Sequence, residues 1–170
     1  ALWILPAFPP KMWRALLWIF LIGQVVLSLI SLGPLVLDYE ATVLAIKKNG
    51  NVPVAGSISH IYFGLYLVEA VVIALYLFRE DVPLFWKKEK WLALGLGLFC
   101  VVALHIFTSR TGLLAFYSTT FLIVLYYLFY QKTYLAGIAM LLILIAIPFV
   151  AIQTIPSLKM RWDVTVWDLQ

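Results

Sequence analysis

Residues 106–117 read IFTSRTGLLAFY and lie between two long apolar runs. The centre of this stretch places one guanidinium, three hydroxyls and one glycine in a link that is too short to form a domain of its own. Apolar runs of such length are typical of membrane helices, so we expect two helices to meet here at one face of a membrane. Arg110 would lie at their junction, where a charge has either a function or a partner.

The composition of the chain indicates a membrane protein. Hydrophobic residues make up 65% of the sequence and charged residues 12%, and the mean hydropathy is +1.04, far from the balance of a soluble globular domain. A helix that crosses about 30 Å of hydrocarbon needs about 20 apolar residues, so the chain is long enough for several spans. Cys100 is the single cysteine, which excludes an intrachain disulfide.

The chain alternates between apolar segments and short polar ones. We expect an all-α polytopic bundle of at least five spanning helices, which forms a single transmembrane domain over residues 1–170. Gly33-Pro34 is expected to kink the first helix or to end it early, and residues 38–57 are expected to form a polar loop. Residues 156–170 are expected to begin a further loop of a longer protein. The predicted helices cover residues 15–37, 58–78, 91–108, 111–130 and 134–155.

Basic residues collect in the short links on one side of this topology, which is therefore assigned to the cytoplasm. The junction at Arg110, the loop 38–57 and the tail 156–170 then share the outer face. The net charge of +4 follows from this bias and does not indicate nucleic acid. No phosphate-binding glycine loop, zinc-ligand cluster or soluble catalytic motif is present in the sequence, so no metal or cofactor is predicted. The residues assigned to the cytoplasmic side are Lys11, Arg14, Arg79, Lys87, Lys88, Lys90 and Lys132.

Arg110 is the strongest candidate for a binding residue. It precedes a predicted helix whose first residues, Thr111, Gly112 and Leu113, are expected to expose backbone N–H groups. A helix N-terminus beside an arginine favours a phosphate. The alternative is an interfacial arginine that only anchors the helix in the membrane.

Glu69 is a carboxyl near the middle of the second predicted helix. Together with Tyr62, Tyr66 and Tyr76 it forms one stripe at helical spacing, so we expect this face to turn toward protein. Its functional interpretation is a contact with a proton or a substrate. The alternative is a carboxyl that is neutral or paired for packing within the bundle.

The two histidines lie near the outer ends of predicted helices. His60 begins the second helix and is a candidate general base or phosphate contact, although a histidine at a helix end is more often structural. His105 lies one turn before Ser109 and shares a face with it and with Thr108. We predict that His105 forms a hydrogen bond between helices.

Several stretches resemble one family. The sequence TSRTGLLA at residues 108–115 is similar to the Ser-Arg-x-Gly hinge of the O-antigen ligase and O-antigen polymerase superfamily of bacterial membrane glycosyltransferases. HIYFGLYL at residues 60–67 is similar to the histidine-led start of a preceding helix in Bacteroidetes-like members. IPSLKMRW at residues 155–162, followed by Trp167-Asp168, resembles the opening of their large periplasmic loop. The resemblance covers roughly residues 57–170.

The resemblance implies a GT-C-like fold in the bacterial inner membrane, with the active face in the periplasm. Such enzymes transfer a glycan from undecaprenyl pyrophosphate to a sugar hydroxyl, either on lipid A-core or on another carrier-linked repeat, as a step of lipopolysaccharide biosynthesis. They are expected to use no metal and no nucleotide sugar, because the leaving group is already a lipid pyrophosphate.

The family's basic positions map onto Arg110 in the hinge and Arg161 at the start of the periplasmic loop. The resemblance implies that both bind the pyrophosphate. His60, Ser109 and Glu69 are further candidates for lining the site. The catalytic residue itself is expected in a later part of the periplasmic loop, after residue 170.

Three classes of function stay open at this point. O-antigen ligation is preferred, and polymerisation with the same donor is its alternative. A transporter or flippase of lipid-linked or small solutes is supported by Glu69, although such proteins usually place ionisable residues near the midplane and show internal repeats. A structural subunit of a membrane complex is also compatible with the aromatic-rich helices.

Overall fold

A computed structural model describes residues 9–40, 42, 44, 54–55, 58–79, 86, 88–107, 110–130, 138, 141–142 and 146. These residues are helical or irregular and include no strand, which confirms the predicted all-α class. Within them, four helices are long and apolar enough to cross a membrane. The predicted fifth span, residues 134–155, lies outside the described residues except for isolated positions, and the predicted loop 156–170 lies wholly outside them.

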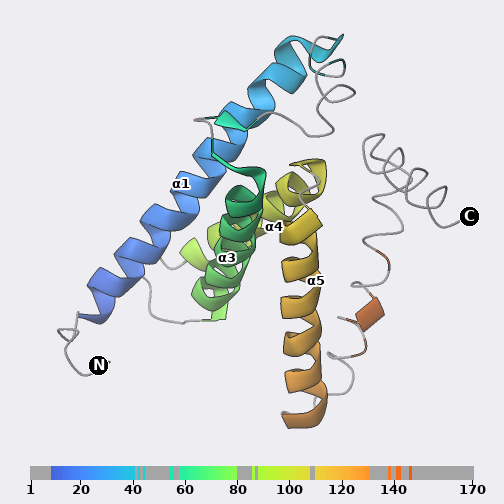
Figure 1. Ribbon diagram of the computed structural model, residues 1–170. Helices are drawn as coiled ribbons and strands as arrows, with labels where there is room; N and C mark the ends of the chain where they lie inside the picture. The colour runs from blue at the N-terminus through green and yellow to red at the C-terminus, as the bar shows by residue number, and fades with distance from the viewer. Residues whose placement is uncertain are drawn as a thin grey trace, which may run out of the picture.

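Figure 1 shows how the described helices are arranged. The longest helix, α1, lies across the pair formed by α3 and α4, and α5 stands beside that pair. Four regular helices and one terminal π-helical turn are described: α1 (Pro10–Leu37), α3 (His60–Arg79), α4 (Glu89–Phe107), α5 (Arg110–Leu125) and η3 (Tyr126–Tyr130).

The start of α1 differs from the prediction, and its end agrees with it. The helix begins at Pro10 rather than at residue 15, because a proline in the first turn needs no N–H partner and its φ is already helical. It continues through Pro34 to Leu37, the predicted last residue, so of the two expectations for Gly33-Pro34 the early end does not occur. The Pro34 carbonyl accepts hydrogen bonds from the Asp38 N–H at 2.9 Å and from Thr42 Oγ1 at 3.0 Å. These bonds extend helical structure into the start of the predicted loop 38–57.

The core lies where α3 packs against α4. The buried face of α3 includes Phe63, Leu67 and Ala74, while α4 contributes Ala103 and Phe107. The rings of Phe63 and Phe107 meet edge to face, with centroids 4.9 Å apart. Small residues at this interface bring the two backbones together, which strengthens van der Waals packing where water supplies no hydrophobic driving force.

The outward faces of the helices are also apolar. Large side chains such as Ile19, Ile30, Leu98, Leu114 and Leu122 are more than half exposed among the described residues. A helix that is apolar on every face belongs either in a large core or in a membrane. The lengths of the helices and their outward apolar faces therefore both indicate a multi-pass membrane protein.

Two glycines mark the closest approaches between helices. A Cβ added at Gly112 would lie 2.8 Å from the Gly64 Cα and 2.9 Å from Leu104 Cδ1, and one added at Gly97 would lie 2.6 Å from the Ala74 Cβ. At both positions the nearest atom belongs to a backbone or is directly attached to one. Neither neighbour can move aside cheaply, so glycine is required at these crossings.

The substitution Gly112→Ala is expected to reduce the free energy of unfolding by about 1–3 kcal/mol, the usual cost of overpacking a tight interface. Gly95→Ala on α4 is the matched control, because no atom lies within 4 Å of its added Cβ. Alanine is the better helix former, so this control should be neutral or stabilising by up to about 1 kcal/mol. Denaturation of the purified protein in detergent measures both changes. Equal stability of the two variants would mean that α3 and α5 do not touch at Gly112.

Candidate functional site at the Arg110 end

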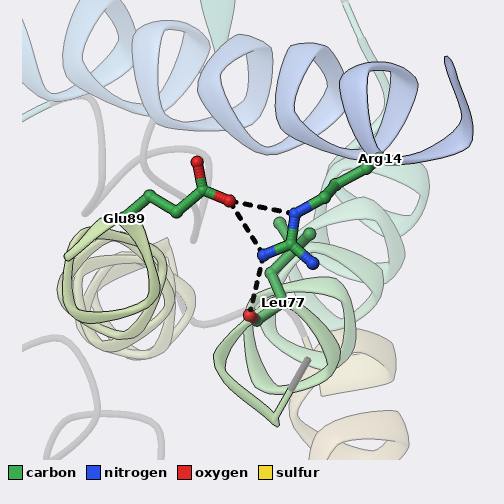
Figure 2. A network of polar contacts seen from close by, with 3 residues as sticks. All are labelled: Arg14, Leu77 and Glu89. Atoms are coloured by element: carbon green, nitrogen blue, oxygen red, sulfur yellow. Dashed lines mark hydrogen bonds and ion pairs between the residues drawn. The ribbon is translucent and has the colours of Figure 1, made fainter. Parts of the chain in front are cut away.

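One end of the bundle is held by a buried ion pair (Figure 2). Arg14 near the start of α1 places its Nη2 2.8 Å from Glu89 Oε1, and its Nε donates to the same oxygen at 2.9 Å. The Nη2 also donates to the carbonyl of Leu77 at 3.5 Å. The start of α1, the end of α3 and the start of α4 therefore share this end, which we call the Arg14 end.

Sequence analysis did not predict this pair. Arg14 was assigned only to the cytoplasmic charge bias, and Glu89 was not singled out. The side chains are 8% and 2% exposed, which makes them an internal clamp on three helices rather than a solvated surface pair. The available signal was one acid and one base, each beside the start of an apolar helix on the same predicted side.

The opposite end, which we call the Arg110 end, contains the starts of α3 and α5. Gly112 in the first turn of α5 lies against Gly64 in the second turn of α3, so the starts of the two helices are side by side. Arg110 is the first residue of α5, and its side chain is exposed. Thr111 is exposed as well, but Gly112 is buried against α3. Gly112 thus has a packing role, and the exposure of backbone N–H groups at residues 111–113 stays a prediction.

The other predicted site residues are distributed unevenly. His60 begins α3 and is half-buried, one turn before Gly64, so it lies at the same end of the bundle as Arg110. Ser109 and Arg161 lie outside the described residues. Among the predicted residues, the structure thus brings Arg110 and His60 to one end.

His105 forms the predicted hydrogen bond between helices. Its Nδ1 lies 2.7 Å from the carbonyl of Val101, and its Nε2 lies 2.8 Å from the hydroxyl of Tyr117 on α5. Since the carbonyl can only accept, Nδ1 carries the proton. In the neutral ring with this tautomer, Nε2 accepts the hydrogen bond that the Tyr117 hydroxyl donates. The ring is also edge to face with Phe116 and Tyr117. His105 therefore links the last turn of α4 to the second turn of α5, close to the Arg110 end.

Glu69 lies on an exposed face of α3. Its side chain is exposed among the described residues, and Tyr62, Tyr66 and Tyr76 on the same stripe are 61%, 41% and 52% exposed. Tyr66 meets the ring of Phe20 edge to face, with centroids 6.4 Å apart. The described helices leave most of this stripe uncovered, and the expectation that it faces protein with a hydroxyl or basic partner stays a prediction.

No cluster of three or more His, Cys, Asp or Glu side chains that could hold a metal is present in the described part of the chain. Its charged features include the exposed Arg110 at one end and the Arg14–Glu89 pair at the other. Such a bundle, apolar around its circumference and charged at its ends, defines the class of multi-pass membrane proteins. Comparisons with protein-family models, with curated proteins and with solved structures find no match to this chain.

Proposed function

We propose that this protein is a membrane glycosyltransferase that moves a glycan from undecaprenyl pyrophosphate to a sugar hydroxyl, with its site at the Arg110 end. The supporting observation is the exposed Arg110, the first residue of α5, at the end of the bundle where α5 meets the start of α3 through Gly112 and Gly64. The similarity of residues 108–115 to the hinge of O-antigen ligases and polymerases supports the same function. A helix N-terminus that carries an arginine is suited to phosphate.

The chemistry requires stabilisation of a leaving group. The acceptor hydroxyl attacks the anomeric carbon of the glycan, the bond from that carbon to the pyrophosphate oxygen breaks, and the electron pair leaves with the pyrophosphate. Negative charge develops on the phosphate oxygens, and a fixed guanidinium stabilises it without reorganisation. Arg110 supplies this charge in the proposal, and Arg161 is proposed as its counterpart. The base that accepts the hydroxyl proton is not assigned to any described residue.

Ligation to lipid A-core is preferred over polymerisation, which uses the same donor and differs only in the acceptor. Both place the site on the periplasmic face of the bacterial inner membrane. A transporter or flippase of lipid-linked or small solutes is the second candidate. It is favoured by Glu69, whose exposed carboxyl lies within an apolar helix, where ionisable residues are costly and often functional.

The lipopolysaccharide of a strain that lacks the gene distinguishes these functions. A gel should show lipid A-core without O-antigen, and extracts should contain long glycan that accumulates on the carrier, if the protein is a ligase. Core that carries a single repeat would indicate a polymerase. Unchanged profiles of both glycans would contradict the proposed role in lipopolysaccharide and would favour the transporter.

A further inference from the structure

The hydrogen bond between His105 and Tyr117 spans the link from α4 to α5. The Tyr117 hydroxyl donates to His105 Nε2 over 2.8 Å, and Nδ1 of the same ring lies 2.7 Å from the carbonyl of Val101 on α4 itself. His105 is only 4% exposed, so its ring is shielded from water. The imidazole is therefore fixed on α4, and its Nε2 presents one acceptor to α5.

Tyr117 lies where it can set the rotation of α5 about its own axis. It follows Arg110 by one heptad, so the two side chains leave the helix within about 20° of each other. The contact of α5 with α3 at Gly112 and Gly64 fixes a distance, but neither glycine has a side chain that resists rotation. Helix α5 contacts α4 far less than it contacts α3. The bond from Tyr117 to His105 is thus a directional contact that holds one face of α5 toward α4.

Aromatic contacts surround this bond. The ring of His105 meets the rings of Phe116 and Tyr117 edge to face, in both cases with centroids 5.9 Å apart. Phe116 is itself buried. These contacts depend on the rings, so a substitution that removes only the Tyr117 hydroxyl keeps them. The hydrogen bond can therefore be tested separately from the packing.

The rotation of α5 decides the direction of Arg110. Atoms at the side-chain surface of a helix lie about 5–6 Å from its axis, so a rotation of about 10° moves them by about 1 Å. A misplacement of about 1 Å in the reacting geometry can cost about 10²-fold in rate. Arg110 is exposed at the start of α5, so its position depends on the turns that follow it.

We propose that His105 is a positioning residue for glycan transfer. Through Tyr117 it fixes the rotation of α5, and thereby the direction in which the Arg110 guanidinium meets the pyrophosphate. This inference rests on the function proposed above. His105 is buried and does not itself touch the substrate, so Arg110 stays the group that meets the developing negative charge. A role limited to stability would instead leave the contribution of Arg110 to the rate unchanged.

Steady-state transfer by the purified full-length protein tests this role, with undecaprenyl pyrophosphate that carries a labelled glycan as the donor and lipid A-core as the acceptor. Tyr117→Phe removes the hydroxyl and should lower kcat by about 10–100-fold. His105→Leu removes the acceptor from the other helix and should have a similar effect. His105→Gln keeps an oxygen that can accept from Tyr117, so its kcat should stay close to that of wild type.

The decisive readout is Tyr117→Phe in the Arg110→Ala background. If the hydrogen bond acts through Arg110, this second substitution should lower kcat little further, because the group that the bond positions is already absent. An equal fold-loss in both backgrounds would overturn the positioning role and would show that the bond acts on stability alone. Tyr76→Phe is the matched control, since Tyr76 is a 52% exposed residue of α3, and it should transfer at the wild-type rate.

The same assay separates this inference from the function on which it rests. Transfer at the wild-type rate by Tyr117→Phe, when Arg110→Ala transfers poorly, would overturn the positioning role and would leave the proposed function intact. Absence of transfer by the wild type would overturn the proposed function and the positioning role with it. Variants on two different helices keep the test valid if one of them fails to fold.

Discussion

Replacing Arg110 by alanine in the full-length protein is expected to reduce glycan transfer by about 10²–10³-fold while the protein still accumulates in the membrane. This is the usual loss when one preorganised group that stabilises a developing anion is removed. Arg110 is exposed on the first residue of α5, so its truncation creates no cavity and leaves no buried partner behind. The lipopolysaccharide made by a deletion strain that expresses the variant measures the loss.

Two further variants separate catalysis from anchoring. Arg110→Lys keeps the charge but loses the planar, forked donor set, so its activity should lie between those of wild type and alanine. Lys11→Ala removes an exposed cation from the start of α1, near the Arg14 end, and should leave transfer unchanged. Transfer at the wild-type rate by Arg110→Ala would contradict a catalytic role and would show that Arg110 only anchors the helix at the membrane interface.

Breaking the Arg14–Glu89 pair is expected to cost about 3–5 kcal/mol of the free energy of unfolding. Glu89→Leu removes the carboxylate that lies 2.8 Å from Arg14 Nη2 and leaves a guanidinium that is 8% exposed without its counter-ion. The double variant Arg14→Met/Glu89→Leu removes both charges. It should recover most of the loss, because a well-packed apolar pair avoids the desolvation of two ions.

A double-mutant cycle in detergent measures the coupling between the two side chains. Lys11→Met is the control, since Lys11 precedes Arg14 by one turn but is exposed. This control should change the stability by less than about 0.5 kcal/mol. Additive effects of the two single substitutions would show that Arg14 and Glu89 do not interact, and the alignment of α1, α3 and α4 in Figure 2 would lose its main support.

The helical segments were predictable because hydrocarbon imposes a minimum length on any span. The predicted starts and ends were less accurate where local chemistry decides them. Pro34 was expected to kink α1 or to end it early, but the helix runs to Leu37, and the Pro34 carbonyl accepts hydrogen bonds from Asp38 and Thr42, which extend helical structure beyond it. These bonds depend on the path of the following residues, and no pattern in the sequence specifies that path.

Partners between helices were predictable only where the chain itself limits the choice. His105 and Tyr117 lie on either side of a short link, so a hydrogen bond between the helices that carry them was a reasonable expectation. Arg14 and Glu89 are 75 residues apart, and the sequence offers many other pairings for each. The ion pair follows from the arrangement of three helices, which hydropathy does not determine.

The face of α3 that packs against α4 is not the one that the periodic pattern at Glu69 singles out. A stripe of tyrosines with one carboxyl is polar enough to be expected inside a membrane bundle. In the structure, α3 instead buries Phe63, Leu67, Ala70 and Ala74, whose small and aromatic side chains fit against α4. Close packing between helices decided the orientation, and the mean polarity of the faces did not.

Reconstitution of the purified full-length protein in liposomes tests the central claim most directly. The donor is undecaprenyl pyrophosphate that carries a labelled glycan, and the acceptor is lipid A-core. If the protein is a transferase, the wild type should place the label in a new glycosidic bond to the acceptor and release undecaprenyl pyrophosphate. Arg110→Ala should form little of either product. Movement of intact labelled donor across the bilayer, without any new glycosidic bond, would contradict the account and would identify a flippase.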